Sequence, residues 1–377
     1  MNLNPNGVTG FMITHIHILE NFIPEAHLLP FNGNSAIFFD IETTGFTAGK
    51  NSIYLIGCCL YENQRWQVIQ WMAENQTPDE QTAVLEAFLD CISHCKNLVS
   101  FNGATFDLPF IEKSCAHFKI PCDFSNINHY DIYKAVRPLK KLLGMKSLKL
   151  KAIEQFLGIF REDQYSGGAL IPIYETYIKS QSQKLLSLLL LHNFEDIKDM
   201  LHILPILNYT KILDSKNCSL TLTLCQWQGD GLHLQLEAEC LFPVQITKDL
   251  PITSALDSSI KIIFNNSSIE LFIPSYHGEL LYFYENYRDY YYLPHEGCAV
   301  HKSVAQYVDT AHRKKATPKN CYTRKSGIFL PQPEPLITPA FKYAYDDSWH
   351  WFEYTENVSK GTAFHEYICR LLQLCIA

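Results

Sequence analysis

The sequence predicts a mixed α/β sheet flanked by helices, followed by a β-rich C-terminal region that ends in a helix. Two observations carry this prediction. In the first half, three short apolar runs precede an alternation of helical and strand patterns, which is typical of a sheet with strands of both directions. After about Lys211 the apolar residues recur with period two instead. We therefore expect one domain over residues 1–210 and a β-rich region over residues 211–377.

Strand and helix patterns follow one another through the first half. A hairpin turn at Glu62–Arg65 joins the second and third strands, and Thr77-Pro78 is a helix start signal. The predicted strands span residues 36–41, 53–61, 66–72, 97–101 and 127–132. The predicted helices span residues 78–95, 108–118, 132–143, 149–157 and 182–204.

The second half is dominated by short alternating runs separated by turn residues such as Gly229-Asp230-Gly231. These runs predict strands over residues 220–224, 232–237, 260–264, 269–273 and 280–284. Apolar residues at helical spacing between Val300 and Ala311 predict an amphipathic helix. A closing helix is expected over residues 362–374.

The composition excludes several classes of protein. Apolar residues make up 47% of the chain and charged residues 19%, so the chain can bury a large core and is not disordered as a whole. Its longest aliphatic stretch is far shorter than the ~20 residues of a membrane span. Thirteen cysteines at irregular spacings, without a CxxC pair, argue against a disulfide framework and against common zinc sites. We expect a protein of the reducing cytoplasm.

Positive charge is concentrated in two segments, although the net charge of −8 argues against a general nucleic-acid binder. The segment from Lys134 to Lys151 contains seven basic residues and no acidic residue, and a second basic run extends from Arg313 to Lys325. A solvated helix face explains the first segment as well as phosphate binding does. The lysines that we select as candidate phosphate contacts are Lys140, Lys141, Lys146 and Lys149.

Two acidic residues lie at the end of the first predicted strand. Asp40 and Glu42 point to one face because residues i and i+2 of a strand share a face, while Phe39 and Ile41 point to the other. Two carboxylates beside a buried apolar strand are costly without a counter-ion. A strand end at which two solvated acids begin a loop explains the motif equally well.

A second polar motif, Asn102 to Asp107, follows the fourth predicted strand. Asn102-Gly103 predicts a tight turn, and Asp107 lies near a helix start. Taken alone, Asp107 is best explained as a helix N-cap. An N-capping carboxylate still leaves one oxygen free for a metal ion.

The third motif lies on the long helix predicted near the end of the first domain. His192 and Asp196 are at positions i and i+4, so they share one helix face. A surface contact within the helix is the common explanation of such a pair. We expect Glu195 and Asp199, on other faces, to be solvated.

In their order, these motifs resemble those of the DEDD superfamily of 3′–5′ exonucleases, which has the ribonuclease H-like fold. More narrowly, the chain is similar to the YprB-type ribonuclease H-like domain. The resemblance covers residues 36–207 and rests on Asp40, Glu42, residues 102–107, 148–158, 161–163 and 165–168, and His192-Asn193 to Asp196.

The resemblance implies a two-metal nuclease. Asp40, Glu42, Asp107 and Asp196 would hold two Mg²⁺ or Mn²⁺ ions, which clamp the attacking and leaving oxygens of a phosphodiester. Oxygen ligands suit such hard cations. The implied substrate is a single-stranded 3′ end, and a helicase is the candidate protein partner. We expect Asn102 and the four candidate lysines to contact the substrate strand. The alternatives are a non-catalytic nucleic-acid-binding module and a scaffold that acts through the C-terminal half.

One spacing departs from the superfamily pattern. A histidine precedes the last aspartate by five residues in one branch, and a tyrosine precedes it by four in another. Here His192 precedes Asp196 by four. We expect His192 to orient or deprotonate the attacking water; the alternative is that it packs or forms hydrogen bonds beside the site.

Overall fold

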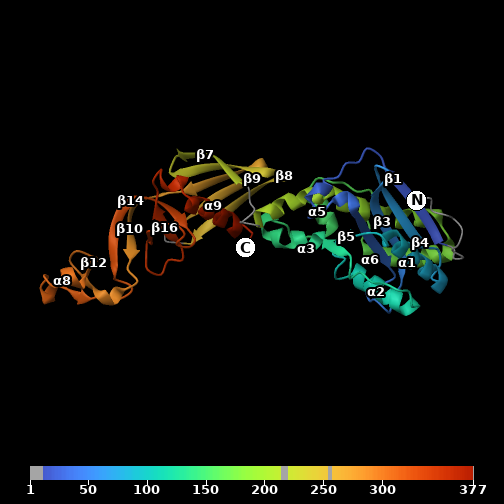
Figure 1. The fold of residues 1–377 in the computed structure, drawn as a ribbon, viewed down its shortest axis with the longest axis horizontal. Helices are drawn as coiled ribbons and strands as arrows, with labels where there is room; N and C mark the ends of the chain where they lie inside the picture. Colours follow the sequence, from blue (N-terminus) through green and yellow to red (C-terminus); the bar gives the residue numbers. More distant parts are fainter. Residues whose placement is uncertain (1–11, 214–219, 254–256, 377) are drawn as a thin grey trace. The chain divides into compact units, whose positions relative to one another are not determined.

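The computed structural model describes residues 12–213, 220–253 and 257–376. The chain divides into two compact units (Figure 1). The first holds the described residues up to Thr210 except Lys141–Leu143, and these three residues belong to the second unit together with the chain from Lys211 onward. None of the helices in the described ranges has the length and apolar character needed to cross a membrane.

The first unit is built on a mixed sheet of six strands in the order β1-β4-β3-β2-β5-β6. The four strands from β1 to β2 pair antiparallel, and β2, β5 and β6 pair parallel. Their bounds are β1 Met12–Leu19, β2 Ala36–Thr43, β3 Ile53–Glu62, β4 Arg65–Ala73, β5 Asn97–Ser100 and β6 Asn128–Asp131. The mixed sheet confirms the predicted fold class. Strand β1 was not predicted; it lies at the edge of the sheet, where its side chains are only partly buried and its apolar pattern is weak.

The predicted hairpin between β3 and β4 is confirmed. Asn63 and Gln64 have φ of 51° and 63°, and two consecutive left-handed residues are the signature of a tight turn that matches the strand twist.

Helices cover both faces of this sheet. Their bounds are α1 Pro78–Ile92, α2 Asp107–Phe118, α3 Ile132–Val136, α4 Lys140–Leu143, α5 Leu150–Phe156, α6 Gly167–Ser180 and α7 Gln183–His202. The helix predicted over residues 132–143 is interrupted by a 3₁₀ turn that contains Pro138, because proline removes a backbone donor. Helix α6 was not predicted, since Gly167, Gly168 and Pro172 weaken its helical pattern.

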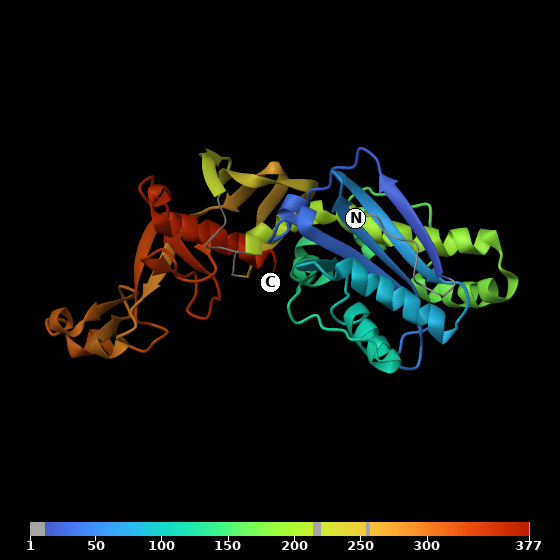
Figure 2. The same ribbon diagram turned by 45° about the vertical axis from the view of Figure 1, so that its right-hand side comes forward.

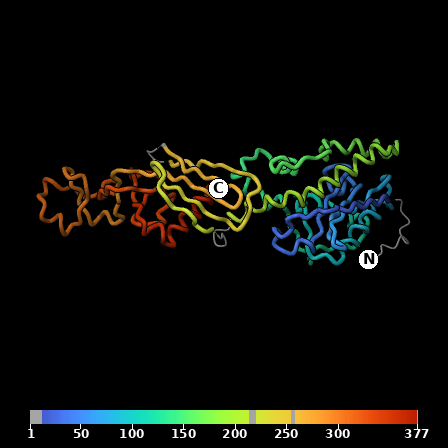
Figure 3. The backbone as a smooth tube through the Cα atoms, turned by 90° about the horizontal axis from the view of Figure 1, so that it is seen from above, coloured from blue at the N-terminus to red at the C-terminus, as the bar shows by residue number. Residues whose placement is uncertain are grey.

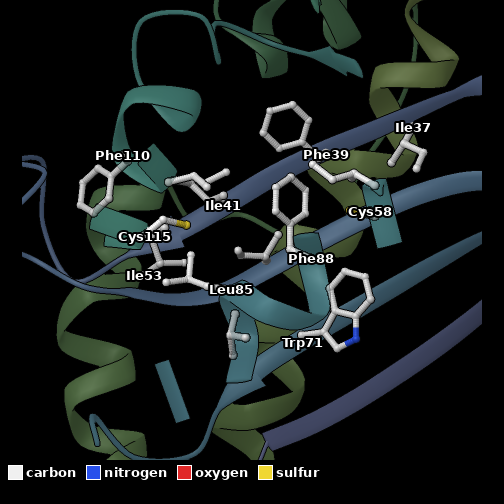
Figure 4. Close-up of a cluster of buried hydrophobic side chains, with 14 of the residues drawn as sticks. Ile37, Phe39, Ile41, Ile53, Cys58, Trp71, Leu85, Phe88, Phe110 and Cys115 are labelled. Carbon is white, nitrogen blue, oxygen red and sulfur yellow. The ribbon is translucent and has the colours of Figure 1, made fainter. Parts of the chain in front are cut away.

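The two faces of β2 have different neighbours. Phe39 and Ile41 pack against α1 and α2 in an apolar core, in which the rings of Phe39 and Phe88 lie 5.5 Å apart (Figure 4). Helices α6 and α7 run along the opposite side of the sheet (Figure 3). Their apolar side chains pack against Tyr54 and Leu55 of β3. Asp40 and Glu42 therefore face the side that carries α7, as the strand period predicts.

Gly57 allows α7 to lie close to the sheet. This residue of β3 pairs with Asp40 of β2, and a Cβ atom on it would lie 2.1 Å from Ile197 Cδ1 and 2.2 Å from Asn193 Oδ1. Any side chain here would push α7 away from the sheet. Because Gly57 has no side chain, α7 packs close enough to the sheet for Asn193 to reach Asp40.

The described residues of the second unit form three antiparallel sheets, in agreement with the predicted β-rich region (Figure 2). Long strands form the first sheet, so that residues 260–264 and 269–273 belong to one strand. The bounds are β7 Leu220–Gln228, β8 Gly231–Thr253, β9 Asp257–Pro274, β10 Tyr276–Phe283, β11 Tyr290–Leu293, β12 Cys298–His301, β13 Lys314–Lys315, β14 Tyr322–Gln332, β15 Ala340–Phe341 and β16 His350–Glu353.

The closing helix is confirmed as α9, Thr362–Leu374. The amphipathic helix predicted between residues 300 and 311 is wrong. An α-helix is present only over the four residues of α8, Lys302–Ala305, with a separate 3₁₀ turn at Thr310–His312, and Tyr307 is 85% exposed. The apolar residues there have helical spacing, but they do not share a buried face.

Candidate metal centre

Four acidic side chains from β2, α2 and α7 come together on the α7 side of the sheet. Burial raises the pKa of Asp40 well above its usual range, and the carboxylates of Asp107, Asp196 and Glu42 raise it further. Burial also raises the pKa of Glu42, with further contributions from Asp196 and Asp107. Such mutual shifts require that the four carboxylates lie near one another. The structure thus brings together the acidic residues that the sequence analysis selected.

Asp107 contacts β2 and does not cap its own helix. Phe106 occupies the N-cap position of α2, while Asp107 Oδ1 accepts a hydrogen bond of 3.2 Å from the backbone N–H of Ile41. A Cβ atom on Gly103 would lie 3.1 Å from Asp107 Oδ2, so the glycine leaves room for this carboxylate. Burial, together with Asp131 and Asp196, raises the pKa of Asp107 to about 7, although the Ile41 N–H opposes the shift. The N-cap explanation is therefore wrong.

The loop before α2 is held by Asp131, which the sequence analysis did not select. Its carboxylate accepts hydrogen bonds from the backbone N–H groups of Asn102, at 2.9 Å, and Ala104, at 3.2 Å. It also caps α3 through the N–H of Lys134. Asn102 itself has a left-handed backbone, with φ of 68°, and its side-chain oxygen accepts a hydrogen bond from Thr105.

His192 lies inside the site, so the surface-contact explanation is wrong. Its side chain is only 3% exposed, and its Nδ1 lies 2.6 Å from Asp163 Oδ2. Its Nε2 lies 3.5 Å from Glu42 Oε1 and 3.6 Å from Asp196 Oδ2. The imidazole therefore lies between Asp163 on one side and Glu42 and Asp196 on the other.

Asn193, the next residue of α7, fixes the carboxylate of Asp40. Its side-chain nitrogen donates a hydrogen bond of 3.1 Å to Asp40 Oδ2, and its oxygen accepts one of 2.9 Å from Gln70 Nε2. Gln70, Gly57 and Asp40 are register neighbours on β4, β3 and β2. Asn193 therefore ties this face of the three strands to α7, a role that the sequence analysis did not assign.

A buried arginine behind the site is the largest feature that sequence reasoning missed. The side chain of Arg161 is 5% exposed and forms two hydrogen bonds of 2.6 Å to the carboxylate of Glu154. It also contacts Asp196 Oδ1, and its Nε lies 3.6 Å from Asp199 Oδ2. Arg161 lies in a loop, where no periodic pattern could have revealed it. The family resemblance included residues 161–163 but gave Arg161 no role.

The expectation that Glu195 and Asp199 are solvated is wrong, because both are buried. The two oxygens of Glu195 accept hydrogen bonds from the backbone N–H groups of Glu162, at 3.0 Å, and Asp163, at 2.9 Å. Asp199 lies between Arg161 and His202. Glu195 and Asp199, which lie on different faces of α7, thus hold the segment around residues 161–163 against that helix.

Asp163 is also held from outside by Lys151. The ammonium lies 2.8 Å from Asp163 Oδ2 and contacts the carbonyl oxygen of Tyr165, whose N–H donates to Asp163 Oδ1 at 3.0 Å. Burial raises the pKa of Asp163, but these hydrogen bonds outweigh burial and lower it below its usual value. Lys151 therefore has a structural partner. The side chains of Lys140, Lys141, Lys146 and Lys149 are exposed.

The donor set fits divalent cations. The carboxylates supply hard oxygen ligands, and ligand atoms of Glu42, His192 and Asp196 all lie within 4.8 Å of one another. Burial and the charges of neighbouring acids raise the pKa values of Asp40, Glu42 and Asp107. A bound cation would offset both costs of holding these carboxylates in their ionised form, and it would supply a Lewis acid.

The raised pKa of Asp107 predicts how pH affects the stability of the metal-free protein. Asp107 has a pKa of about 7 in the folded state, against an ordinary value near ~3.9 in an unfolded chain. Its protonated form stabilises the fold fully below that ordinary value, and this contribution is lost as pH rises through about 7. In EDTA we therefore expect the melting temperature of Asp107→Asn, relative to that of the wild type, to rise between roughly pH 4 and pH 8. A difference that stays constant over this range would contradict the prediction.

Comparison with known proteins agrees with this architecture. Residues 37–208 match the family model described as the ribonuclease H superfamily. These residues form a ribonuclease H-like domain. The domain is similar to an uncharacterized protein of Bacillus subtilis (strain 168), YprB, with 30% identity over 175 residues. The match covers 45% of this chain and 41% of YprB, so the chain matches less than half of its curated relative.

Two solved structures are distant matches. A family B DNA polymerase from the archaeon Pyrobaculum calidifontis is 11% identical with a TM-score of 0.38, over 71% of this chain and 39% of the polymerase. A structure described as the apo form of the nuclease is 17% identical with a TM-score of 0.30, over 48% of this chain and 75% of that chain. At such TM-scores neither likeness bears on the function of the ribonuclease H-like domain.

Proposed function

We propose that the ribonuclease H-like domain is a metal-dependent nuclease that hydrolyses phosphodiester bonds from a 3′ end with two Mg²⁺ or Mn²⁺ ions. The observation that carries this proposal is the cluster of Asp40, Glu42, Asp107 and Asp196, in which Glu42 and Asp107 are buried and neighbouring carboxylates repel one another. A module that only binds a polyanion would gain nothing from holding four acids together, because they repel phosphates. With cations bound, the same acids become a binding site for phosphate.

The four acids have different places in this site. The pKa of Asp40 responds to all three of the others, which is the position expected of a carboxylate shared by two cations. Hydrogen bonds from Asn193 to Asp40 and from the Ile41 N–H to Asp107 fix their orientation before substrate binds. Each carboxylate still has a second oxygen for a cation. Two cations supply charge stabilisation to the attacking and leaving oxygens.

We infer that the substrate strand is bound by groups outside the carboxylate cluster. Lys140, Lys141, Lys146 and Lys149 are exposed and would neutralise phosphates. Asn102 lies in the loop that positions α2, where its exposed face would contact the terminal nucleotide. The β-rich unit would position substrate or a protein partner, for which a helicase is the candidate.

The proposal is tested with single- and double-stranded DNA and RNA that carry a label at the 5′ or the 3′ end, incubated with Mg²⁺, Mn²⁺ or EDTA. We expect cation-dependent shortening of 5′-labelled single strands and immediate release of a mononucleotide from 3′-labelled strands. Asp107→Asn should be inactive, whereas Asp90→Asn, on the exposed surface of α1, should retain activity. Products cut in mid-strand would contradict the exonuclease assignment. Absence of cleavage with every cation would overturn the proposal.

A further inference from the structure

Only one of the two ring nitrogens of His192 is engaged at normal hydrogen-bond distance. Nδ1 is 2.6 Å from Asp163 Oδ2, whereas Nε2 is 3.5 Å from Glu42 Oε1 and 3.6 Å from Asp196 Oδ2. Protein hydrogen bonds to nitrogen are about 2.7–3.2 Å long. Nε2 therefore points between two carboxylates without a close contact to either, in a side chain that is 3% exposed.

These spacings match those between ligands of one cation. With metal–ligand bonds of about 2.1 Å, two ligand atoms lie roughly 3.0 Å apart in octahedral and roughly 3.4 Å apart in tetrahedral coordination. The two Nε2 distances, 3.5 and 3.6 Å, are slightly longer than these spacings, and the three ligand atoms fall within 4.8 Å of one another. An ion among them would need only small movements of the side chains.

Asp163 determines which ring nitrogen carries the proton. Lys151 and the Tyr165 N–H donate hydrogen bonds to Asp163, so its carboxylate acts as an acceptor. His192 Nδ1 therefore donates to Asp163 Oδ2, and Nε2 is the ring nitrogen that can offer a lone pair to a cation. A carboxylate behind a histidine, which fixes the ring and its tautomer, is the usual support of a metal-ligating imidazole.

We propose that His192 Nε2 is a metal ligand which, with Glu42 and Asp196, forms a cation position that binds Mn²⁺ in preference to Mg²⁺, with Asp163 as its positioning residue. Imidazole nitrogen is a ligand of transition metals, whereas Mg²⁺ strongly prefers oxygen. This inference rests on the proposed function, whose metal centre it deepens. It replaces the water-activating role expected for His192, because a lone pair donated to an ion is no longer available to accept a proton.

The direct test is pulsed electron paramagnetic resonance of the full chain with Mn²⁺ alone. We expect a ¹⁴N coupling from a coordinated imidazole in the wild type and its loss in His192→Gln. Titration of the free Mn²⁺ signal should show at least tenfold weaker Mn²⁺ binding in His192→Gln, with Mg²⁺ binding in competition changed less than threefold. His117→Gln, an exposed histidine at the end of α2, is the matched control and should bind Mn²⁺ as the wild type does.

Asp163→Asn tests the positioning role. We expect it to weaken Mn²⁺ binding by about 10–100-fold while the ¹⁴N coupling persists at saturating Mn²⁺. Absence of the coupling in the wild type, or its persistence in His192→Gln, would overturn the inference even if a variant were poorly folded. Cleavage without ¹⁴N coupling would overturn this inference alone. The coupling without any cleavage would support the metal position and overturn the proposed nuclease.

Discussion

Asp40→Asn is expected to abolish both cation-dependent cleavage and cation-dependent stabilisation. Asp40 lies among the other three carboxylates, so its loss removes the ligand that we place between the two ions. Charge stabilisation of several kcal/mol corresponds to a fall in cleavage rate of about 10³-fold or more. The measurement is the rate of shortening of a 5′-labelled single strand at saturating Mn²⁺.

Thermal unfolding provides the second readout of the same substitution. A cation at a hundred times its dissociation constant stabilises the wild type by about 2.7 kcal/mol, which is roughly 5–10 °C in a domain of this size. Asp40→Asn should lose nearly all of this shift. Its metal-free form should melt no lower than the metal-free wild type, because a repelling buried charge has been removed.

Asp90→Asn is the control for both measurements, because this exposed aspartate lies on α1, on the opposite side of the sheet. It should keep the wild-type rate and thermal shift. A full Mn²⁺ shift in Asp40→Asn would place the metal elsewhere, and a wild-type cleavage rate would separate the activity from this cluster.

Arg161→Met is expected to cause the largest loss of stability in the first unit. The guanidinium is 5% exposed and contacts the carboxylates of Glu154, Asp196 and Asp199, of which Glu154 and Asp199 are almost fully buried. Methionine approximates the volume of the side chain but leaves these charges without their cation. Removing one partner of a buried ion pair costs about 3–5 kcal/mol, so the melting temperature should fall by roughly 10 °C.

Two further substitutions separate the ion pairs from general effects of losing a charge. Arg137→Met removes an exposed arginine and should change the melting temperature by about 1 °C or less. Arg161→Lys keeps the charge but loses the two-point contact with Glu154, so it should fall between the wild type and Arg161→Met. If Arg161→Met and Arg137→Met melt at the same temperature, the network does not support the fold.

Short-range features of the site were predictable from the sequence. The period of a strand places Asp40 and Glu42 on the face opposite Phe39, and the period of a helix places His192 above Asp196; the structure agrees with both. The convergence of Asp107 with these residues followed from the resemblance, since spacing alone favoured an N-cap. The long helix α7 and the closing helix α9 were also predictable, because their apolar spacing extends over several turns.

Burial of charged residues was not predictable in the same way. Glu195 and Asp199 have the sequence pattern of solvated residues, yet both are buried, because the segment around residues 161–163 folds over them. The helix expected between residues 300 and 311 is absent for the opposite reason, since Val304 and Tyr307, which its buried face requires, remain exposed.

By itself, then, the sequence determined which side chains share a face within one strand or one helix, because such relations depend only on backbone period over a few residues. Tertiary structure alone decided that Asp163 supports His192 and that Arg161 holds Asp196. These partners lie 29 and 35 positions apart in the chain. Which charges become buried together depends on how distant segments pack, and no local pattern records that packing.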